Sequence, residues 1–584
     1  MRKTIYSIGF LVLESVLSIG LFTACGDQFQ EEYPWMIGRQ QDQDNTNEEG
    51  AGATDITILE KELRGAIPYM ISYTKGGSWQ PHAYQYQRSN SIDNYAGYWT
   101  TTKGSFAFGG ALPTLYTYPN DYLGGPMDNT IFTQSYNAIH YAETLGKPEW
   151  RAVALIIQAY QGHEIVDFYG AAPFTDWRNL KRTPPLTYEK GEDIYKQIFD
   201  DLDEAIRILK ERQPSRDEIS KIEDLTIRTL SNGEWRMWVK FANSIKMRMA
   251  MNIVKYDAGT AQAKFEQAVN DDIGVLSEAD ARDIAYYQNQ NSCVWYTLGN
   301  SWHDIRLGAS LENILKRCNH PLLTRWFDTN PYTIKDKYSG ITAKSDVYGV
   351  RAGINMSGNN TTDREKGYGP FATLRGEFQY MHQPFFKRTE SLFLMAEGAL
   401  RGWNTKGRTA QELYEAGIRL CFQENGITDE EVINQYLEQT EVNDVDYVDP
   451  YNGENNIAGR VNVCVKWNDG DSNETKLEKI ITQKYIANFP MSAEAWTTFR
   501  RTGYPRLFPV KLNNMKDQNV DTELQLRRIP IVETTNNELE IASLVQALGQ
   551  PNWGGSRVFW DIADETRGEQ SPDNEYLLVE PHNF

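Results

Sequence analysis

The stretch that decides the fold of this chain is residues 388–425, RTESLFLMAEGALRGWNTKGRTAQELYEAGIRLCFQEN. Both of its halves repeat apolar or small residues at helical spacing, and the segment 403–407 between them is typical of a turn. Gly426 follows the second half as a helix C-cap. Small residues on both halves let two helices approach closely: Ala396, Ala399, Ala416 and Gly417. The stretch therefore predicts a helical hairpin of the tetratricopeptide type.

The same apolar period recurs on either side of this stretch. It predicts further helices at residues 55–73, 149–168, 193–210, 232–251 and 476–489. These helices come in pairs joined by short or moderate loops, although strict repeat signatures are absent. We therefore predict a mainly α fold, with tetratricopeptide-like hairpins as the scaffold of a single domain over residues 54–584.

Two long regions of this domain, at about residues 76–125 and 283–370, lack a helical period and are rich in aromatic residues, Gly and Pro. Loops of this length inside a compact domain are uncommon unless they are functional or disordered. Their aromatic content argues against disorder. We expect them to form a loop-rich ligand-binding face.

The first 24 residues have the layout of a secretory signal peptide. Met1-Arg2-Lys3 is basic, residues 9–22 are mostly apolar, and the small Thr23 and Ala24 precede Cys25. A cysteine at the cleavage point is typical of a bacterial lipoprotein, in which Cys25 becomes the lipidated first residue. An ordinary signal peptide with an incidental cysteine, or a short membrane anchor, is the alternative. Residues 25–53 are polar and acidic, and we expect them to form a flexible tether.

Charge and composition narrow the classes of partner. The formal net charge is -20, which disfavours nucleic acid and anionic lipid surfaces as ligands. The four cysteines after Cys25 are widely spaced, without a CxxC or Cys/His pattern, and are expected to be mostly buried: Cys293, Cys318, Cys421 and Cys464. Aromatic residues make up 12% of the chain, with 15 Trp and 33 Tyr, more than the turn-rich stretches can all bury.

Several short motifs, in this order along the chain, resemble the SusD/RagB family of nutrient-binding outer-membrane lipoproteins of Bacteroidetes. The matching segments are DFYGAAP at 167–173, IY at 194–195, DLDEA at 201–205, ANSIKMRMA at 242–250, Glu390, AEGALRGW at 396–403, QKYIA at 483–487, EAW at 494–496, RRTGYP at 500–505 and RRIP at 527–530. Each motif is weak alone, but together they cover nearly the whole mature chain.

The resemblance implies a helical body with tetratricopeptide-like hairpins and a loop-rich ligand face. It also implies a lipid-anchored protein on the outer membrane, facing the cell exterior, that acts as a lid on a SusC-like TonB-dependent transporter. Such a protein captures oligosaccharide or peptide and passes it inward. The shared motifs are expected to be mostly scaffold, so the ligand site must be argued from this sequence.

A sugar ring presents an apolar face that stacks on Trp or Tyr, and its hydroxyl groups need polar partners. The two aromatic regions offer both kinds of residue close together. The candidate ligand-binding residues are Trp79, Asn94, Tyr95, Tyr98, Trp99, Trp295, Tyr296 and Trp302. The alternative for each ring is that it pins a long loop onto the helices.

Catalysis finds little support in the sequence. G-x-S-x-G, H-E-x-x-H and a phosphate-binding glycine loop are all missing, and we expect no catalytic residue, metal ion or cofactor. His163 is expected to be a packed helix residue, and the segment around Asp469 and Asp471 a polar turn. Four functions stay open: oligosaccharide capture, peptide capture, an all-helical secreted glycoside hydrolase, and a purely structural lid.

Overall fold

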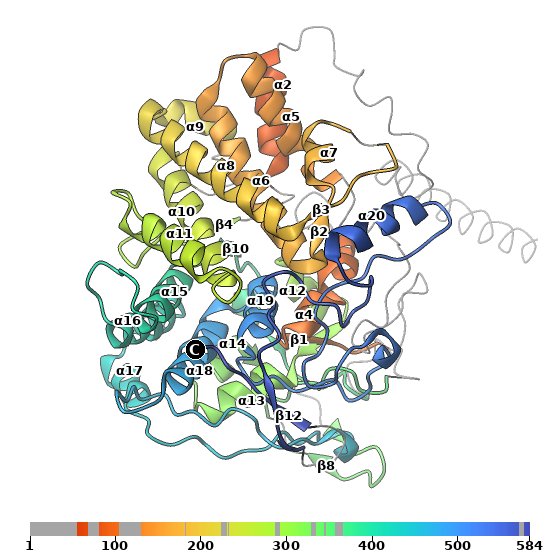
Figure 1. The fold of residues 1–584 in the computed structure, drawn as a ribbon. Coiled ribbons are helices and arrows are strands. Elements are labelled where there is room, and N and C mark those ends of the chain that lie inside the picture. Colours follow the sequence, from red (N-terminus) through yellow and green to blue (C-terminus); the bar gives the residue numbers. More distant parts are fainter. Residues whose placement is uncertain are drawn as a thin grey trace, which may run out of the picture.

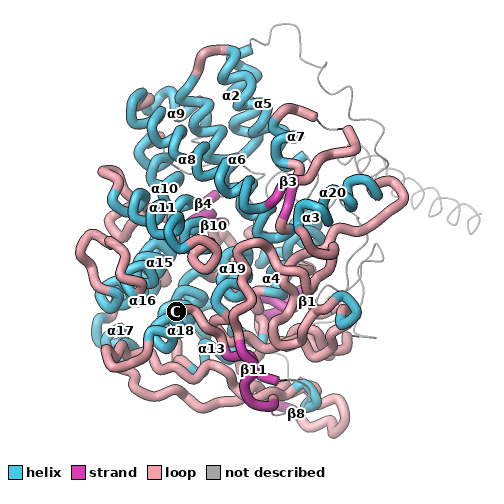
Figure 2. The backbone as a smooth tube through the Cα atoms, viewed as in Figure 1, coloured by secondary structure: helices cyan, strands magenta, loops and turns pink. Residues whose placement is uncertain are grey.

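The computed structural model describes residues 55–67, 70, 81–103, 130–181, 183–223, 231, 233–286, 292–328, 334–343, 346–356, 366–571 and 577–584. Helices dominate these residues and the strands are short (Figures 1 and 2). The predicted mainly α fold is confirmed. The signal peptide and the tether lie outside the described residues.

Long helices form a continuous array in which successive members pack side by side (Figure 1). In chain order the array consists of α2 (Asp55–Ala66), α5 (Thr130–Thr144), α6 (Pro148–Tyr169), α8 (Gly191–Arg212), α10 (Trp235–Asn252), α11 (Ala258–Asn270), α15 (Arg388–Leu400), α16 (Ala410–Glu424), α18 (Asn473–Asn488) and α19 (Ser492–Thr502). Each predicted helix corresponds to one of these, and most ends differ by a few residues; the helix predicted over 55–73 is shorter, because α2 ends at Ala66, and residue 73 lies outside the described residues.

The structure of the hairpin formed by α15 and α16 explains why the sequence of residues 388–425 predicted two closely packed helices. Thr409 caps α16, and the side chain of Glu412 accepts a hydrogen bond from the backbone N–H of Thr409, which completes a capping box. A Cβ atom at Gly417 would lie 2.7 Å from the ring of Phe393 on α15. The two helices can therefore approach this closely only because position 417 has no side chain.

Shorter helices connect and cover this array. They are α3 (Pro81–Tyr84), α4 (Ile92–Tyr95), α7 (Phe174–Arg178), α9 (Arg216–Ile222), α12 (Val294–Tyr296), α13 (Ala309–Arg317), α14 (Leu322–Trp326), α17 (Glu430–Leu437) and α20 (Glu538–Leu548). Two π-helical turns, η3 (Gln85–Ser89) and η6 (Thr297–Ser301), and three 3₁₀ turns, η7 (Gly376–Phe378), η8 (Gly453–Asn455) and η9 (Lys516–Gln518), complete the helical elements among the described residues.

The described strands form six separate antiparallel pairs rather than a sheet. The pairs are β1 (Trp99–Thr101) with β5 (Ile305–Leu307), β2 (Ala171–Ala172) with β3 (Glu189–Lys190), β4 (Ile284–Tyr286) with β10 (Gln383–Phe386), β6 (Phe327–Asp328) with β9 (Thr373–Leu374), β7 (Ile334–Lys335) with β8 (Thr342–Ala343), and β11 (Thr566–Gln570) with β12 (Leu577–Glu580). The first and third pairs join segments about 200 and 100 residues apart, so they fix long connections onto the helices.

The two aromatic regions contain more regular structure than the sequence predicted. Residues 81–101 hold α3, η3, α4 and β1, and residues 284–326 hold β4, α12, η6, β5, α13 and α14. The helical period is hidden here because these helices are short and are buried on most sides. From about Arg527 onward the sequence predicts an irregular segment that wraps the body, but the structure contains α20 and the β11–β12 hairpin there.

Candidate functional site

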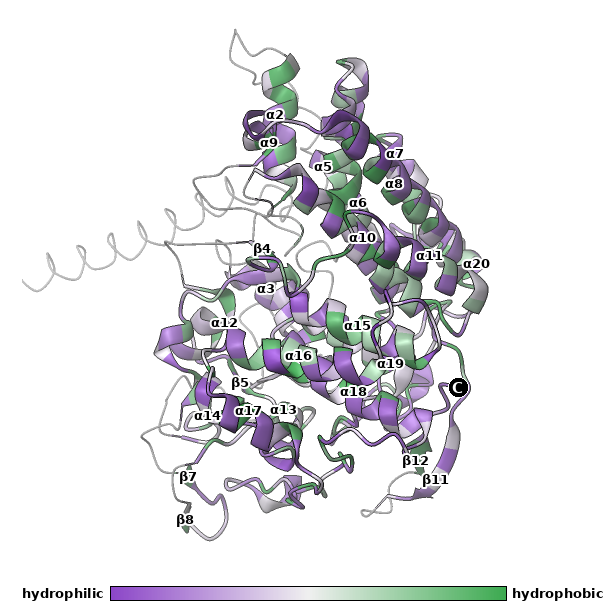
Figure 3. Ribbon diagram, turned by 90° about the vertical axis from the view of Figure 1, so that its left-hand side faces the viewer, coloured by the Kyte–Doolittle hydropathy of each residue, from purple (hydrophilic) through white to green (hydrophobic). Residues whose placement is uncertain are grey.

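The two aromatic regions meet in one face of the molecule. Strand β1 of the first pairs with β5 of the second, with Trp99 opposite Leu307. The Gln85 side chain donates a 2.6 Å hydrogen bond to Asp304, and the rings of Tyr84 and Trp295 make an edge contact with centroids 5.8 Å apart. Helices α3 and α12 accordingly lie at the same side of the molecule (Figure 3). The two regions are therefore in direct contact, and that they form a ligand-binding face stays a prediction.

Part of the unusual backbone geometry of the described residues lies where the two regions meet, while six other non-Gly residues with positive φ lie elsewhere. Both π-helical turns, η3 and η6, lie here, one from each region. His303, directly after η6, has φ at 62°, in the left-handed region that residues other than Gly rarely adopt. π-Helical turns and left-handed residues are frequent at functional sites, because their cost must be offset by the surrounding structure. We therefore take this junction as the centre of the candidate site.

The structure divides the predicted ligand residues into three groups. Trp79 lies outside the described residues. Tyr296 and Trp302 are partly exposed and pack their inner sides against the main core. The remaining five are buried: Asn94, Tyr95, Tyr98, Trp99 and Trp295.

Burial gives these five residues a structural role. Tyr98 has no exposed surface, and its hydroxyl donates a 2.5 Å hydrogen bond to the backbone carbonyl of Tyr485 on α18. Trp99 also has no exposed surface and lies against Phe327 and Phe489. A ring without exposed surface offers no face on which a ligand can stack, so these residues pin the first region onto the helices.

Asn94 is a further correction of the same kind. Its amide nitrogen donates a 2.5 Å hydrogen bond to the carbonyl of Ser89, and its amide oxygen accepts one of 3.0 Å from the backbone N–H of Thr101. Both halves of the amide are therefore used to hold the turn between η3 and β1. The sequence showed an Asn beside aromatic rings, but it did not show that both of its amide groups would form hydrogen bonds with the backbone.

The structure adds Tyr380, which sequence reasoning missed. This side chain is 53% exposed. Its loop lies against α12, because the N–H of Cys293 donates a 2.6 Å hydrogen bond to the carbonyl of Gln379 and the Gln379 side chain donates to Ser292. Tyr380 follows the second predicted region by ten residues, and an aromatic residue among polar neighbours after Gly376 was the available signal. Tyr296 and Trp302, which are partly exposed, and Tyr380, which is exposed, are the rings that we assign to the candidate face.

Asp304 is the carboxylate that the two regions share, and it is not an accessible acid. It is buried, it pairs with Lys103, and it accepts the hydrogen bond from Gln85. The backbone N–H of Thr102 donates a 3.0 Å hydrogen bond to its carbonyl oxygen. Asp304 therefore joins the two regions of the face, which is a positioning task.

The shared sequence motifs are buried in the scaffold, as expected. Arg248 of α10 donates to both carboxylate oxygens of Glu390 on α15, at 2.7 and 2.8 Å. Lys484 of α18 donates a 2.5 Å hydrogen bond to Glu494 of α19. Asp167 at the end of α6 accepts hydrogen bonds from Tyr195 and from the indole N–H of Trp560, and burial raises its pKa to about 7. These contacts cross between helices and fix the array.

The weaker sequence candidates have ordinary structural roles. His163 is buried and lies 3.1 Å from the carbonyl of Ala159, and burial lowers its pKa to about 4. At the polar turn, Lys479 forms a 2.6 Å ion pair with Asp471, so a lysine already occupies the place of a cation. These four described cysteines form no disulfide bond: Cys293, Cys318 and Cys421 are buried, and Cys464 is partly exposed.

Comparison with known proteins places the chain in a family. The family described as SusD-like, "Susd and RagB outer membrane lipoprotein", matches residues 42–561. The chain belongs to the SusD-like family. Among the described residues of this SusD-like protein, no helix is long and apolar enough to cross a membrane. No match is found among curated proteins.

Solved structures of several SusD homologues share this fold. A chitin-binding SusD homologue from Flavobacterium johnsoniae is 31% identical, with a TM-score of 0.71 over 87% of this chain and 98% of that chain. A SusD homologue from Bacteroides thetaiotaomicron is 27% identical, with a TM-score of 0.73 over 87% and 99%. One from Bacteroides uniformis is 26% identical, with a TM-score of 0.72 over 87% and 99%.

Proposed function

We propose that this SusD-like protein is a cell-surface lipoprotein that captures oligosaccharides and delivers them to a partner TonB-dependent transporter of the outer membrane. The observation that carries the proposal is the face where the two aromatic regions meet. It holds Tyr296 on α12, Trp302 directly after η6, and Tyr380 on the loop that is hydrogen-bonded to the start of α12. Exposed rings on a rigid support are what a sugar ring needs for stacking.

Chitin-type oligosaccharides are the first ligands to test. The supporting observation is the 31% identity, over 87% of this chain, to a homologue that binds chitin. Ser301 lies between Tyr296 and Trp302 and is exposed, and His303 directly follows Trp302 and is partly exposed. Their polar atoms suit the hydroxyl and amide groups of such a ligand. Trp79 is also proposed to bind the ligand, on the basis of the sequence alone.

Attachment through lipidated Cys25 and delivery to a transporter belong to the same proposal. The family is one of outer-membrane lipoproteins, and the sequence before residue 26 has the corresponding layout. Expression of the full chain with an affinity tag, followed by membrane extraction and co-purification, tests the partner. Recovery of a TonB-dependent transporter in stoichiometric amount is the expected result, and recovery of the tagged protein alone contradicts delivery.

The ligand class is tested by titration of the lipid-free mature chain, monitored by calorimetry. Chitin oligosaccharides, a pool of other oligosaccharides and a pool of peptides are added separately, and each ligand is analysed afterwards for cleavage. Saturable binding of an oligosaccharide that is recovered intact is expected. Binding of peptides alone supports peptide capture, and cleavage of the sugar supports a helical hydrolase. No binding in any of the three titrations supports a structural lid.

The position of the site is tested by truncating the exposed rings. Trp302→Ala should weaken oligosaccharide binding by about 1–3 kcal/mol, or roughly 5- to 150-fold, by analogy with bases stacked on aromatic side chains. Tyr296→Ala and Tyr380→Ala should act in the same direction. Trp553→Ala is the matched control, because Trp553 is 44% exposed but lies on a turn near the C-terminus. Equal affinity for all four variants would place the site elsewhere.

A further inference from the structure

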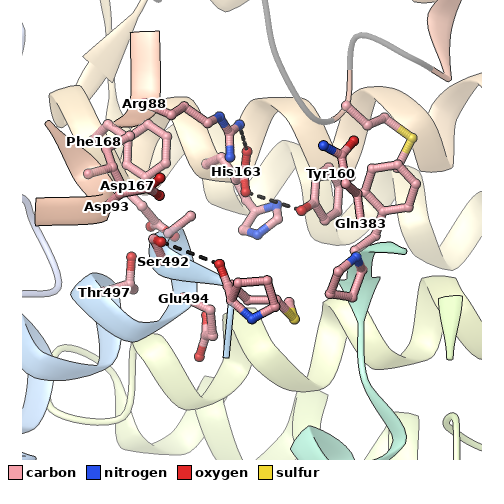
Figure 4. A pocket seen from close by; sticks show the side chains of 18 of the residues that line it. Arg88, Asp93, Tyr160, His163, Asp167, Phe168, Gln383, Ser492, Glu494 and Thr497 are labelled. Atoms are coloured by element: carbon pink, nitrogen blue, oxygen red, sulfur yellow. Dashed lines mark hydrogen bonds and ion pairs between the residues drawn. The ribbon is translucent and has the colours of Figure 1, made fainter. Parts of the chain in front are cut away.

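A small polar cavity lies inside the protein, next to the candidate face. It has a volume of about 50 Å³ and lies between η3, α4, α6, α12, β10 and the start of α19 (Figure 4). Trp295, which lines it, is the direct neighbour of Tyr296 on α12. Asp93 lines it from α4, and Figure 4 shows Asp93 and Gln383 on opposite sides of the space. The cavity therefore separates elements of the face from the scaffold below them.

Three of the lining side chains carry polar atoms that have no direct hydrogen-bond partner. They are Oδ2 of Asp93, Nε1 of Trp295, and both amide atoms of Gln383. Asp93 is fully buried, and Trp295 and Gln383 are each 4% exposed. Buried polar groups are nearly always hydrogen-bonded, since an unpaired one loses its contact with water and gains nothing in return. These buried atoms of Asp93, Trp295 and Gln383 therefore need a hydrogen-bond partner other than the protein.

Many other polar side chains of the wall have protein partners. Tyr84 donates a 3.2 Å hydrogen bond to the other oxygen of Asp93. Arg88 and Tyr160 both donate to Glu164, at 2.6 and 3.2 Å. Arg248 is held by its ion pair with Glu390.

The volume of the cavity and the chemistry of its unpaired atoms indicate which molecule occupies it. A volume of about 50 Å³ exceeds the roughly 10–15 Å³ that one water requires. The unpaired set contains donors, on Trp295 and Gln383, and acceptors, on Asp93 and Gln383. A metal cation could use only the acceptors, whereas water both donates and accepts.

The environment of Asp93 agrees with a bridge through water. Burial raises its pKa to about 6, and Ser492 and Trp295 are near enough to act against that rise. Neither of them is in direct hydrogen-bonding geometry with Oδ2 of Asp93. Polar groups that face each other beyond direct contact are commonly joined by a bound water.

We infer that this cavity is an internal hydration site, in which bound water links Asp93 of α4 and Trp295 of α12 to Gln383 of β10. The water completes the hydrogen bonds of the elements that carry the candidate face and holds them on the scaffold. The inference does not depend on the identity of the external ligand, because Tyr296, Trp302 and Tyr380 do not line the cavity.

A crystal structure of the lipid-free mature chain at about 1.5 Å resolution is the direct test. Density for one or more waters is expected within hydrogen-bonding distance, roughly 2.7–3.2 Å, of Oδ2 of Asp93, Nε1 of Trp295 and the Gln383 amide. A cavity without density overturns the inference. A single peak with several oxygen ligands at roughly 2.3–2.6 Å also overturns it, in favour of a cation.

Oxygen-17 relaxation dispersion gives a second test in solution, because it counts long-lived internal waters. Trp295→Phe and Gln383→Leu remove unpaired atoms while they keep most of the side-chain volume, and each is expected to lose at least one such water. The matched controls are Trp177→Phe and Gln158→Leu, whose polar atoms are equally buried and unpaired but do not line the cavity. An equal count in all four variants contradicts the inference. If a cavity variant fails to fold, the crystal structure of the unsubstituted chain still decides.

Discussion

Glu397→Gln should destabilise this protein strongly, because Glu397 is the centre of a buried ion-pair cluster. Glu397 on α15 has no exposed surface. Both of its oxygens accept 2.7 Å hydrogen bonds from Arg501 of α19, and one also accepts from Arg401 at 2.9 Å. The glutamine has the same shape but no charge, and it cannot accept at both positions. The substitution therefore leaves Arg501 buried without a counter-charge.

The magnitude follows from the pKa of the carboxyl group. Burial acts to raise the pKa of Glu397, but Arg501 and Arg401 overcome it and lower the value from 4.5 to about 2. At about 1.36 kcal/mol for each pKa unit, this difference corresponds to about 3 kcal/mol of stabilisation at neutral pH. Breaking a buried ion pair typically costs about 3–5 kcal/mol, so the two figures agree.

The pH dependence follows with its sign. Because the pKa is lower in the folded state, the stabilisation is complete well above pH 4.5 and is lost as the pH falls toward 2. Roughly half of it remains at pH 3. The difference in unfolding free energy between the natural chain and Glu397→Gln should therefore be largest at pH 7 and shrink on acidification.

The assay is urea unfolding of the lipid-free mature chain, followed by tryptophan fluorescence, at pH 7 and at pH 3. Glu211→Gln is the matched control, because Glu211 pairs with Arg207 on the exposed side of α8 and should contribute less than about 1 kcal/mol. A loss below about 1 kcal/mol for Glu397→Gln at pH 7 refutes the reasoning. A loss of unchanged size at pH 3 refutes its electrostatic part.

Three further substitutions test the core, the helix packing and the membrane anchor. Trp99→Ala should cost about 3–5 kcal/mol of unfolding free energy while the folded fraction keeps its oligosaccharide affinity, measured by urea unfolding and calorimetry; weakened binding by a stable variant would return Trp99 to the ligand site. Gly417→Ala should cost about 1–3 kcal/mol in the same unfolding assay, because its Cβ would meet the Phe393 ring, and an unchanged curve would show that the hairpin can open without cost. Cys25→Ala should release the protein from the membrane fraction, and unchanged fractionation would contradict lipidation at Cys25.

Much of the helical scaffold could be predicted, because long helices with a buried stripe repeat their apolar residues at a fixed spacing. The stripe over 193–210 corresponds to α8, and the capping box at Thr409 marks the start of α16. The short helices α3, α4 and α12 were missed, since a few residues buried on most sides show no period. The helix α20 was missed as well, in a segment expected to be irregular.

The candidate site was predictable as a region but not as a set of residues. Tyr98 and Tyr296 both lie in turn-rich aromatic stretches, yet one has no exposed surface and the other is partly exposed. The difference comes from partners more than a hundred residues away, since the carbonyl of Tyr485 accepts a hydrogen bond from the hydroxyl of Tyr98. No local pattern records such a partner.

The sequence by itself determined the helical class, the family motifs and the bounds of the two aromatic regions. All of these depend on local spacing and residue type. Only the tertiary structure decided which rings face solvent, which carboxylates are neutralised by buried arginines, and where polar atoms enclose a cavity. These properties depend on which distant segments come into contact. Contact between distant segments fixes both the dielectric environment and the hydrogen-bond partners of each side chain.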